Sequence, residues 1–555
     1  MKNMIGRVGP TLRMLRYIKP QQVMSRLDYK TRALYYLSPF YGLMNKGTPV
    51  SRLALVPPEL WPGDPKKGQL IARNTFTFIG RTVNMGEEVR WRPHEVPMLW
   101  LYNLHYFHWL ADLKAMGPEG LTHARRLVED WLLSCNHFSK DVWHPYPLSL
   151  RIVNWLTYAE WLTKDSSAPF KQHFFESLTF QVNHLEKCLE WDVGGNHLIK
   201  NLKALIFAGA CLPGRKSVYL EALGHLIKQL KIQVLPDGAH YELSPHYHVD
   251  VLQDLLDIHA IIRKSRHTPP PKLDEAIDHM AQAFEFYRYP DGTLGLFNDG
   301  AVGDKKFLQA LAKKCGRIEK PGPHLPFAGY VKMQKGDTMV MLDAAKVGPD
   351  ELPAHAHADT LSFEMCVNKQ RVVVNGGTFA YQTPLRDYFR STAAHSTVEV
   401  GKRNSAEVFG AFRLGRRPQQ VDAQVIEEKD MGIGAVASHD GYKYVGVTHK
   451  RSAFLNEEGT ELRGEDVLEG RNGQPVMANF HLHPDVKCSL KSESQAELTL
   501  PDKTKISFKA SGGRLTERES KYAPHFGEMI PTRRLVIQAK LQNNKCVLKW
   551  AFKKL

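Results

Sequence analysis

A short segment in the C-terminal half of the chain combines residue types that could do chemistry. His355, His357 and Asp359 are spaced two residues apart, and residues two apart in a β-strand point to the same face. Arg390 and His395 follow about one strand later. Two imidazoles and a carboxylate on one face, with a third imidazole nearby, suit proton transfer or metal coordination. The alternative without a function is a solvated polar strand.

A second polar group lies upstream, directly after Gly194-Gly195. Asn196 and His197 stand at or near the start of a stretch with helical spacing, residues 198–210. Asn is a good helix cap, which would explain Asn196 structurally. Its amide could equally donate to a substrate carboxylate, helped by the helix dipole. Both interpretations of Asn196 stay open.

The densest group of titratable side chains is the segment 237–248, which holds two tyrosines, three histidines and two carboxylates. Packing alone explains such a composition poorly, so we favour a functional role for it. Aromatic loops elsewhere could line a groove for sugar rings, and residues 297–300 could supply hydrogen bonds, although helix packing explains any single aromatic residue as well. The candidate substrate-binding residues are Trp143, Tyr146, Tyr241, Glu242, His248, Asn298 and Arg390.

The composition favours an acidic partner. The 555 residues carry a formal net charge of +16, with 43% hydrophobic and 24% charged residues. Such a surplus favours nucleic acid, acidic lipid or acidic polysaccharide, but no Lys/Arg block of the nucleic-acid type stands out, so we expect no nucleic-acid partner. The seven cysteines form no CxxC pair, which argues against a disulfide framework. The oligomeric state stays open.

The sequence predicts no integral membrane segment, because no run of about 18 apolar residues occurs. The first 30 residues are basic but lack a continuous apolar core and a small-residue cleavage site. The default expectation is therefore a cytoplasmic protein, with a periplasmic or envelope-associated location as the alternative. Residues 11–36 form a basic helical segment, which we expect to dock on the body of the protein rather than on a membrane surface.

The elements that must position these residues change character near residue 325. Before it, apolar residues recur at helical spacing, as at Ile152, Trp155, Leu156 and Ala159, typical of helical hairpins closed into a ring or partial ring. After it the period becomes two, and strands are expected at 360–367, 371–374, 396–400, 444–449, 505–509 and 547–552. The expected segments are 1–90, helical or irregular; 91–325, helical; and 326–555, β-structure.

Four motifs in a fixed order resemble one family. They are Asn-His, then Asp-Gly…Glu-x-Ser-x-x-Tyr-His, then His-x-His-x-Asp, then Arg-x-Thr-x-x-His-x-Thr. This order is similar to that of the heparinase II/III-like polysaccharide lyases, over roughly residues 95 to 485. The resemblance implies a multidomain α+β fold, with an N-terminal incomplete (α/α) toroid, a C-terminal antiparallel β-sandwich and a cleft between them. It also implies β-elimination of a uronic-acid-containing polysaccharide.

The resemblance implies roles for four catalytic residues. β-Elimination removes a weakly acidic proton beside a carboxylate, so donors must stabilise the developing negative charge; Asn196, with His197, matches this role. Tyr247 matches the tyrosine that protonates the leaving oxygen and also serves as a base. His355 matches the base or base-assisting histidine of the β domain. Which of Tyr247 and His355 abstracts the proton depends on the substrate epimer.

The same resemblance implies a structural divalent metal, zinc or calcium, and no organic cofactor. His357 and His395 match its ligand positions. Family members often supply an Asp from the end of the next strand, where this chain has Asn375, a poorer zinc ligand. A second departure is Lys200, at a position where some relatives have Glu. Lys200 would suit an anionic substrate and would change the pKa values around it.

Three other functions compete with elimination. A glycoside hydrolase needs two carboxyl groups flanking the bond, and Asp237, Glu242 and Asp299 are available. A binuclear metallohydrolase is less consistent, since Thr360 follows the His-x-His-x-Asp motif where such enzymes usually have a further His. A non-catalytic protein that binds or tailors an acidic glycan in exopolysaccharide production is the third alternative.

Overall fold

Two compact units make up the chain. The computed structural model describes residues 2–555, without the side chains of residues 2–7, 39 and 43. The helical unit comprises Lys19–Ile232 and Asp250–Ile277, and the β unit comprises the residues up to Ile18, Gln233–Val249 and Asp278–Leu555. The units interleave along the chain because packing and not sequence position defines them. The segment boundaries expected from the sequence therefore stay predictions.

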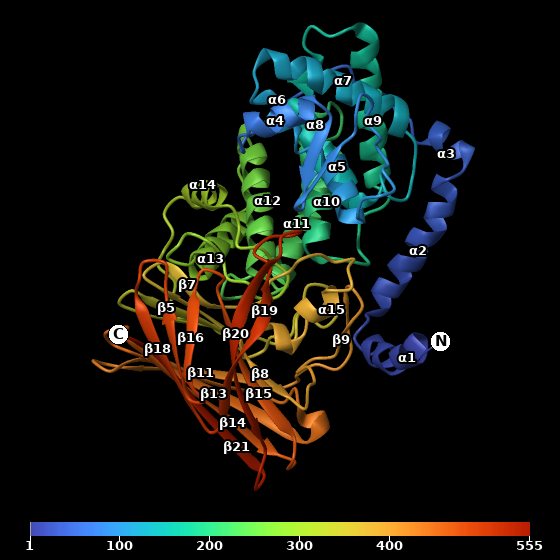
Figure 1. Cartoon of the computed structure of the whole chain (residues 1–555). Helices are drawn as coiled ribbons and strands as arrows, with labels where there is room; N and C mark the ends of the chain where they lie inside the picture. Colours follow the sequence, from blue (N-terminus) through green and yellow to red (C-terminus); the bar gives the residue numbers. More distant parts are fainter. Residues whose placement is uncertain (1) are drawn as a thin grey trace. The chain divides into compact units, whose positions relative to one another are not determined.

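The helical unit is built from helices with one small hairpin (Figure 1). Several helices begin with proline in the first turn, where the missing N–H costs no hydrogen bond, as in α8 after its cap residue His144. The elements are α2 (Pro20–Tyr36), α3 (Pro39–Met44), α4 (Pro65–Ala72), β1 (Thr75–Phe78), β2 (Arg81–Asn84), α5 (Met98–Tyr106), α6 (Leu110–Lys114), α7 (Pro118–Cys135), α8 (Pro145–Thr163), α9 (Ala168–Leu185), α10 (Gly195–Cys211) and α11 (Lys216–Gln233), with parts of α12 (Pro245–Lys264) and α13 (Pro271–Tyr287).

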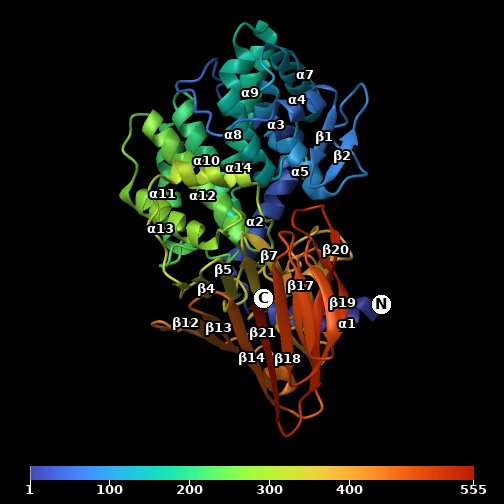
Figure 2. The same ribbon diagram turned by 60° about the vertical axis from the view of Figure 1, so that its left-hand side comes forward.

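The β unit holds two large sheets. The eight-stranded sheet has the order β11-β12-β13-β14-β21-β18-β17-β16, and the nine-stranded sheet runs β19-β20-β15-β7-β6-β5-β4-β3, with β8 paired to β15. Neighbouring strands of both sheets pair antiparallel, as in the orange and red strands of Figure 2.

The strand bounds in chain order are β3 (His324–Leu325), β4 (Tyr330–Lys335), β5 (Thr338–Asp343), β6 (Phe363–Val367), β7 (Gln370–Val374), β8 (Val398–Val400), β9 (Val408–Phe409), β10 (Arg413–Leu414), β11 (Val421–Glu428), β12 (Gly432–His439), β13 (Val447–Asn456), β14 (Glu461–Gly470), β15 (Pro475–Leu482), β16 (Lys487–Ser492), β17 (Gln495–Thr499), β18 (Lys505–Ser511), β19 (Arg514–Tyr522), β20 (Ile530–Lys540) and β21 (Lys545–Lys554). The helices are α1 (Lys2–Leu15), α14 (Lys305–Cys315), α15 (Arg386–Phe389) and the short 3₁₀ turns η1 (Thr392–Ala394) and η2 (Lys443–Val445).

One apolar core joins the two sheets. β13 and β21 alternate buried and more exposed residues along their length, as expected for strands with one face on a core. The core cluster takes side chains from strands of both sheets. Phe363 of β6, for example, stacks on Trp550 of β21 with ring centroids 5.2 Å apart. The fold class is therefore the expected one, a helical toroid and an antiparallel β domain.

Gly464 provides a test of this core. It pairs with Trp550 across β14 and β21, and a Cβ atom at Gly464 would overlap the indole ring. We expect Gly464→Ala to lower the free energy of unfolding by about 1–3 kcal/mol, the usual cost of overpacking, measured by denaturant titration. Gly224 of α11 has open space around it, so Gly224→Ala should be neutral or slightly stabilising. Equal effects of the two substitutions would contradict this packing.

The predicted strand through His355, His357 and Asp359 is wrong. These residues form a loop, and the strand begins only at Phe363. The backbone N–H groups of this loop do not bond to a neighbouring β-strand. The His357 N–H donates to the Asn298 side chain, and the Ala358 N–H donates to the Arg390 carbonyl. The strands expected near residues 371, 396, 505 and 547 are present as β7, β8, β18 and β21.

Two further expectations need adjustment. The segment 444–449 begins with η2, and β13 starts at Val447. The basic segment 11–36 is divided between α1 and α2 rather than forming one helix. No helix of the described chain is both long enough and apolar enough to cross a membrane.

Candidate active site

A buried carboxylate organises the candidate site of the β unit. Asp299 is fully buried and accepts hydrogen bonds from His355 Nδ1 (3.1 Å), His357 Nε2 (2.8 Å), Thr378 Oγ1 (3.0 Å) and both terminal nitrogens of Arg386, Nη2 at 2.7 Å. Burial alone would raise the pKa of Asp299, but Arg386 and the two imidazoles hold it well below its usual range. Asp299 is therefore an anion that only accepts hydrogen bonds.

This anion fixes the proton of His355. Because Asp299 can only accept, His355 must donate through Nδ1, so Nε2 is the ring nitrogen that can exchange a proton. The Nε2 atom lies 3.5 Å from Oε2 of Glu242, which is also buried. His355 can thus take up a proton at Nε2 while keeping its bond to Asp299, and Glu242 is placed to stabilise the imidazolium that results.

Tyr247 lies directly against this base. Its ring stacks on the His355 ring with centroids 3.8 Å apart and an interplanar angle of 24°. Its hydroxyl hydrogen-bonds the hydroxyl of Tyr381. Tyr247 sits in the first turn of α12 and His355 in the loop before β6, so two distant segments bring an acid and a base together within one unit.

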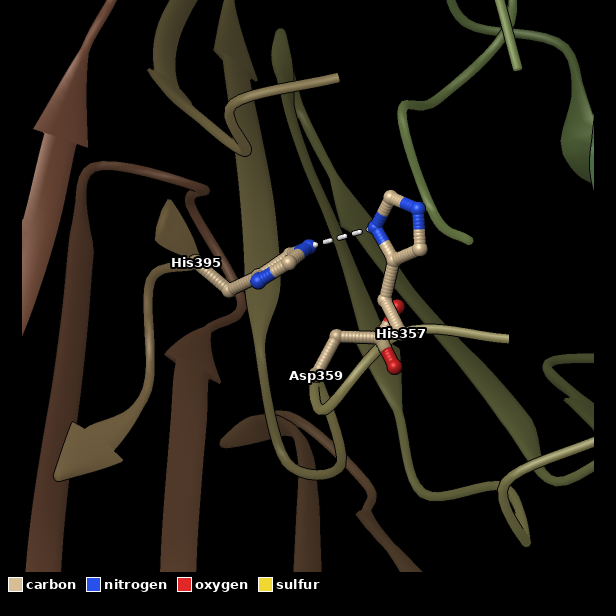
Figure 3. Close-up of side chains that lie close together, drawn as sticks. All are labelled: His357, Asp359 and His395. Atoms are coloured by element: carbon tan, nitrogen blue, oxygen red, sulfur yellow. Dashed lines mark hydrogen bonds between the residues drawn. The ribbon is translucent and has the colours of Figure 1, made fainter. Parts of the chain in front are cut away.

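His357, Asp359 and His395 form the one candidate metal-ligand group found among the described residues. A ligand atom of each lies within 4.8 Å of the others, and Figure 3 shows the two rings facing each other beside the carboxylate. His395 Nδ1 lies 2.7 Å from the Ser391 carbonyl and must donate to it, so its Nε2 carries a lone pair. His357 donates through Nε2 to Asp299, so its Nδ1 also carries a lone pair.

Those two lone pairs face each other at 3.1 Å. Burial lowers the pKa of His357 to about 4 even with Asp299 beside it, so a proton between the rings is disfavoured near neutral pH. A cation bound by both nitrogens and by the Asp359 carboxylate resolves the conflict, and two imidazoles with one carboxylate are a common zinc ligand set. The donor set therefore fits a divalent metal.

A second histidine pair in the β unit satisfies its ring nitrogens with hydrogen bonds alone. The Gly441 N–H donates to His439 Nδ1, His439 Nε2 lies 3.2 Å from His449 Nδ1, and His449 Nε2 lies 2.8 Å from Asp466. Each neutral ring here donates once and accepts once, so all four ring nitrogens of His439 and His449 are satisfied. The conflict between the lone pairs of His357 and His395 does not arise at this second pair.

The structure places Asn375 differently from the expected ligand. Its Oδ1 accepts the Ser396 N–H at 2.9 Å, and its amide donates to Ser362 Oγ at 3.3 Å. Asp359, which the sequence interpretation did not count among the ligands, belongs to the metal-ligand group instead. Metal binding through Asn375 stays a prediction without a contact that supports it.

The helical unit carries its own polar group around Glu190. The buried Glu190 accepts from His197 Nδ1 at 2.9 Å and from the Asn201 amide at 3.0 Å. Burial would raise the pKa of Glu190, but His197 and its other neighbours lower it. The Tyr146 ring lies 4.2 Å from the His197 ring, centroid to centroid. Tyr146, Glu190 and His197 therefore form one cluster.

Asn196 is not the cap of α10. The N-cap is Gly194, which makes no side-chain capping bond, and Asn196 is the second residue of the helix with its side chain buried. The capping interpretation is wrong, which leaves the substrate-binding interpretation as the prediction for Asn196.

Lys200 lies in a buried ion-pair network. Its ammonium group is 2.9 Å from Asp254, and Lys203 contacts both Asp254 and Asp257 at 2.9 Å and 2.5 Å. Burial would lower the pKa of Lys200, but Asp254 raises it above its ordinary value. Lys200 is therefore a charged group with a protein partner, and its predicted contact with substrate competes with that ion pair.

Other predicted binding residues use their polar atoms inside the protein. The Trp143 indole donates to the Cys135 carbonyl, His248 bonds the His240 N–H and the Met280 carbonyl, and Asn298 bonds Leu243 and His357. Arg390 donates to the carbonyls of Ala356, Gly410 and Arg413. These side chains hold loops in place. Tyr241 is partly exposed beside His240, so its predicted role is compatible with its position.

Sequence reasoning missed Arg386, Tyr381 and Glu190. Arg386 precedes the recognised Arg390 by one turn, but its partner Asp299 is 87 positions away. Glu190 stands seven residues before His197, a spacing with no motif. Only the folded chain brings these groups together.

Comparison with known proteins adds the family. Residues 74–318 match the family described as Heparinase II/III N-terminus, and residues 317–551 match Heparinase II/III-like, C-terminal. FtsZ-localized protein C of Caulobacter vibrioides is 31% identical over 466 residues, covering 79% of each chain. A heparin-sulfate lyase of Pedobacter heparinus is 24% identical over 362 residues, which cover 57% of this chain and 52% of the lyase.

Solved structures share the fold. A crystal structure of heparinase III superposes with a TM-score of 0.75 at 16% identity, covering 98% of this chain and 93% of that one. A heparan sulfate lyase from Pedobacter heparinus gives a TM-score of 0.61 at 18% identity, covering 95% and 88%. At these identities the superpositions establish the fold alone.

Proposed function

Because the chain belongs to the heparinase II/III-like family, we propose that it is a polysaccharide lyase that cleaves a uronic-acid-containing polysaccharide by β-elimination. The observation that carries the proposal is the pairing of Tyr247 with His355. One residue is a phenol suited to donate a proton, and the other is an imidazole that can exchange one at Nε2. Elimination needs both activities and no nucleophile.

In the proposed reaction the C-5 proton of the uronate leaves to a base, and the glycosidic oxygen leaves with a proton. His355 Nε2 is the base or assists it, with Asp299 holding the ring and stabilising the imidazolium. Tyr247 donates the proton to the leaving oxygen, and Tyr381 orients the Tyr247 hydroxyl. Arg386 keeps Asp299 ionised, so the charge that supports His355 persists through the cycle.

Binding of the uronate carboxylate by Asn196 and His197 stays the prediction that the family resemblance implies. Glu190 accepts a hydrogen bond from Nδ1 of His197, which fixes the orientation of the imidazole ring. A neutral amide and an imidazole suit the extra negative charge that develops when the proton leaves. The formal charge of +16 agrees with an acidic substrate.

The carboxylates fit a glycoside hydrolase poorly. Asp299 is bound on both oxygens by Arg386 and the imidazoles, so it can act neither as a nucleophile nor as an acid. Asp237 accepts the backbone N–H groups of Ala239, Phe327 and Ala328 and serves a loop. Only Glu242 remains, and hydrolysis requires two carboxyl groups.

A binding protein without catalysis is the second candidate. It is favoured by the 31% identity to FtsZ-localized protein C, a relative whose name refers to its location with FtsZ and not to a reaction. The test that separates the two is a lyase assay on heparan sulfate, hyaluronan, alginate and the host's own surface polysaccharide, followed by the ultraviolet absorbance of the unsaturated uronate. Absorbance with any substrate supports the lyase; binding without absorbance supports the second candidate.

We also propose that His357, His395 and Asp359 hold a divalent metal, zinc by its ligand types. When bound, the ion would supply positive charge that neutralises Asp359 and fixes the two rings in the loop beside His355. His357 would bind the ion and also donates to Asp299, which in turn orients His355. The ion would therefore stabilise the position of the base and would need no contact with substrate.

Removal of this metal should lower thermal stability. We expect Zn²⁺ to raise the melting temperature of the wild-type chain and a chelator to lower it, because a ligand that binds only the folded state stabilises it. His395→Ala should abolish both shifts and the copurified zinc measured by mass spectrometry. His439→Ala is the matched control, since that buried pair is satisfied without a metal. A zinc shift that survives in His395→Ala would contradict the assignment.

A further inference from the structure

The start of the chain concentrates two surface properties. Residues 1–50 contain nine Lys and Arg but a single acidic residue, Asp28, which gives half of the net charge of +16. Half of the exposed large hydrophobic residues of the described chain also fall in this region: Val8, Leu12, Leu15, Val23, Met24, Leu27, Leu34, Tyr35, Leu37, Phe40 and Met44. Positive charge and exposed apolar side chains together are the signature of a surface that meets anionic lipid.

Helix α2 shows how these side chains are arranged. One of its faces is already in contact with the helical unit: the Tyr36 hydroxyl and Arg32 donate to the Lys187 carbonyl, and Arg26 pairs with Asp192 at 2.9 Å. The contacts on this face therefore hold the helix in place. They do not involve the aliphatic side chains of the other face.

The other face of α2 forms an apolar row. At about 100° per residue, Val23, Leu27 and Leu34 fall within about 40° of one another around the helix, and with Met24 they are 48–71% exposed. Lys30 lies within the same row, on the turn between Leu27 and Leu34. Phe40 and Met44 of α3 continue the exposed apolar surface at 71% and 75%.

We propose that this face of α2, with the exposed residues of α3, is a peripheral binding surface for anionic membranes. Its aliphatic side chains would enter the boundary between headgroups and acyl chains, and Lys30 would contact acidic headgroups. The surface is independent of the proposed lyase activity, since none of its residues belongs to the clusters around Asp299 or Glu190.

Vesicle flotation of the full chain tests the proposal. We expect the wild-type chain to float with vesicles of phosphatidylcholine and phosphatidylglycerol in equal parts, and to bind at least about tenfold more weakly to phosphatidylcholine alone or in high salt, because screening removes the headgroup attraction. Leu27→Glu/Leu34→Glu should reduce binding to the anionic vesicles at least about tenfold, and Lys30→Glu should reduce it less.

The control variant is Leu133→Glu, which places the same charge on a 78% exposed leucine of α7 in the same unit. It should bind like the wild type, and all variants should keep the wild-type melting temperature. Equal binding of Leu27→Glu/Leu34→Glu and the wild type would overturn the proposal. A wild-type chain that does not bind anionic vesicles would also overturn it. If that chain is a dimer in size-exclusion chromatography and the double variant is a monomer, the apolar row contacts a second copy of the chain instead of a membrane.

Discussion

Tyr247→Phe is expected to reduce lyase turnover by about 10²–10⁴-fold, the usual contribution of a general acid–base group. The substitution removes only the hydroxyl and keeps the ring that stacks on His355 at 3.8 Å, so substrate affinity and the melting temperature should change little. The loss should therefore appear in kcat, followed by the absorbance of the unsaturated product.

Tyr388→Phe is the matched control for this result. Tyr388 stands in α15, in the same unit but outside the cluster around Asp299, so its hydroxyl should be dispensable. Tyr381→Phe should fall between the two, because Tyr381 orients the Tyr247 hydroxyl without touching the reacting atoms. If Tyr247→Phe retains wild-type turnover, the phenol is not the acid and the proposed reaction loses its proton donor.

Asp299→Asn is expected to lower the free energy of unfolding by about 3–5 kcal/mol, the cost of leaving one partner of a buried ion pair uncompensated. Arg386 would keep its charge beside a neutral amide, and because His355 and His357 bond different oxygens of Asp299, one of the two imidazoles would lose its acceptor. Turnover should fall as well, because a neutral amide no longer stabilises the imidazolium that forms on His355. Denaturant titration measures the first effect and the lyase assay the second.

Asp237→Asn is the control that separates the loss of a buried ion pair from the loss of hydrogen bonds to a carboxylate. Asp237 accepts three backbone N–H groups and no charged side chain, so its replacement should cost about 1–3 kcal/mol and leave turnover nearly intact. Equal stability losses for Asp237→Asn and Asp299→Asn would mean that the Arg386 ion pair contributes little to the β unit.

Strong periodicity predicted helices and strands correctly. The prediction failed at the histidine loop, where bonds outside any β-sheet hold the backbone. The alternation of β13 and β21 and the helical spacing within α8 follow from a face that packs on a core. The histidine loop has a similar alternation, but its N–H groups are bonded by Asn298 and by the Arg390 carbonyl. Two-residue spacing in a polar segment is thus weak support for a strand.

The candidate site was predictable in its residue types but not in its partners. His355 and Tyr247 could be singled out because imidazole and phenol do proton transfer and lie in motifs of a known order. Arg386 and Glu190 could not. Arg386 acts through its ion pair with Asp299, which is distant in the sequence, and Glu190 through its hydrogen bond with His197, at a spacing that belongs to no motif. Arg390 could be singled out from the sequence, but its partners could not: it donates to the backbone carbonyls of Ala356, Gly410 and Arg413.

The most direct test of the central claim is the fate of water during cleavage. The chain would be incubated in oxygen-18-labelled water with each substrate of the panel, and the products analysed by mass spectrometry and ultraviolet absorbance. Elimination breaks the bond without adding water, so the account predicts unsaturated products that carry no label, with formation abolished in Tyr247→Phe. Products that gain one labelled oxygen and show no absorbance would establish hydrolysis and contradict the account.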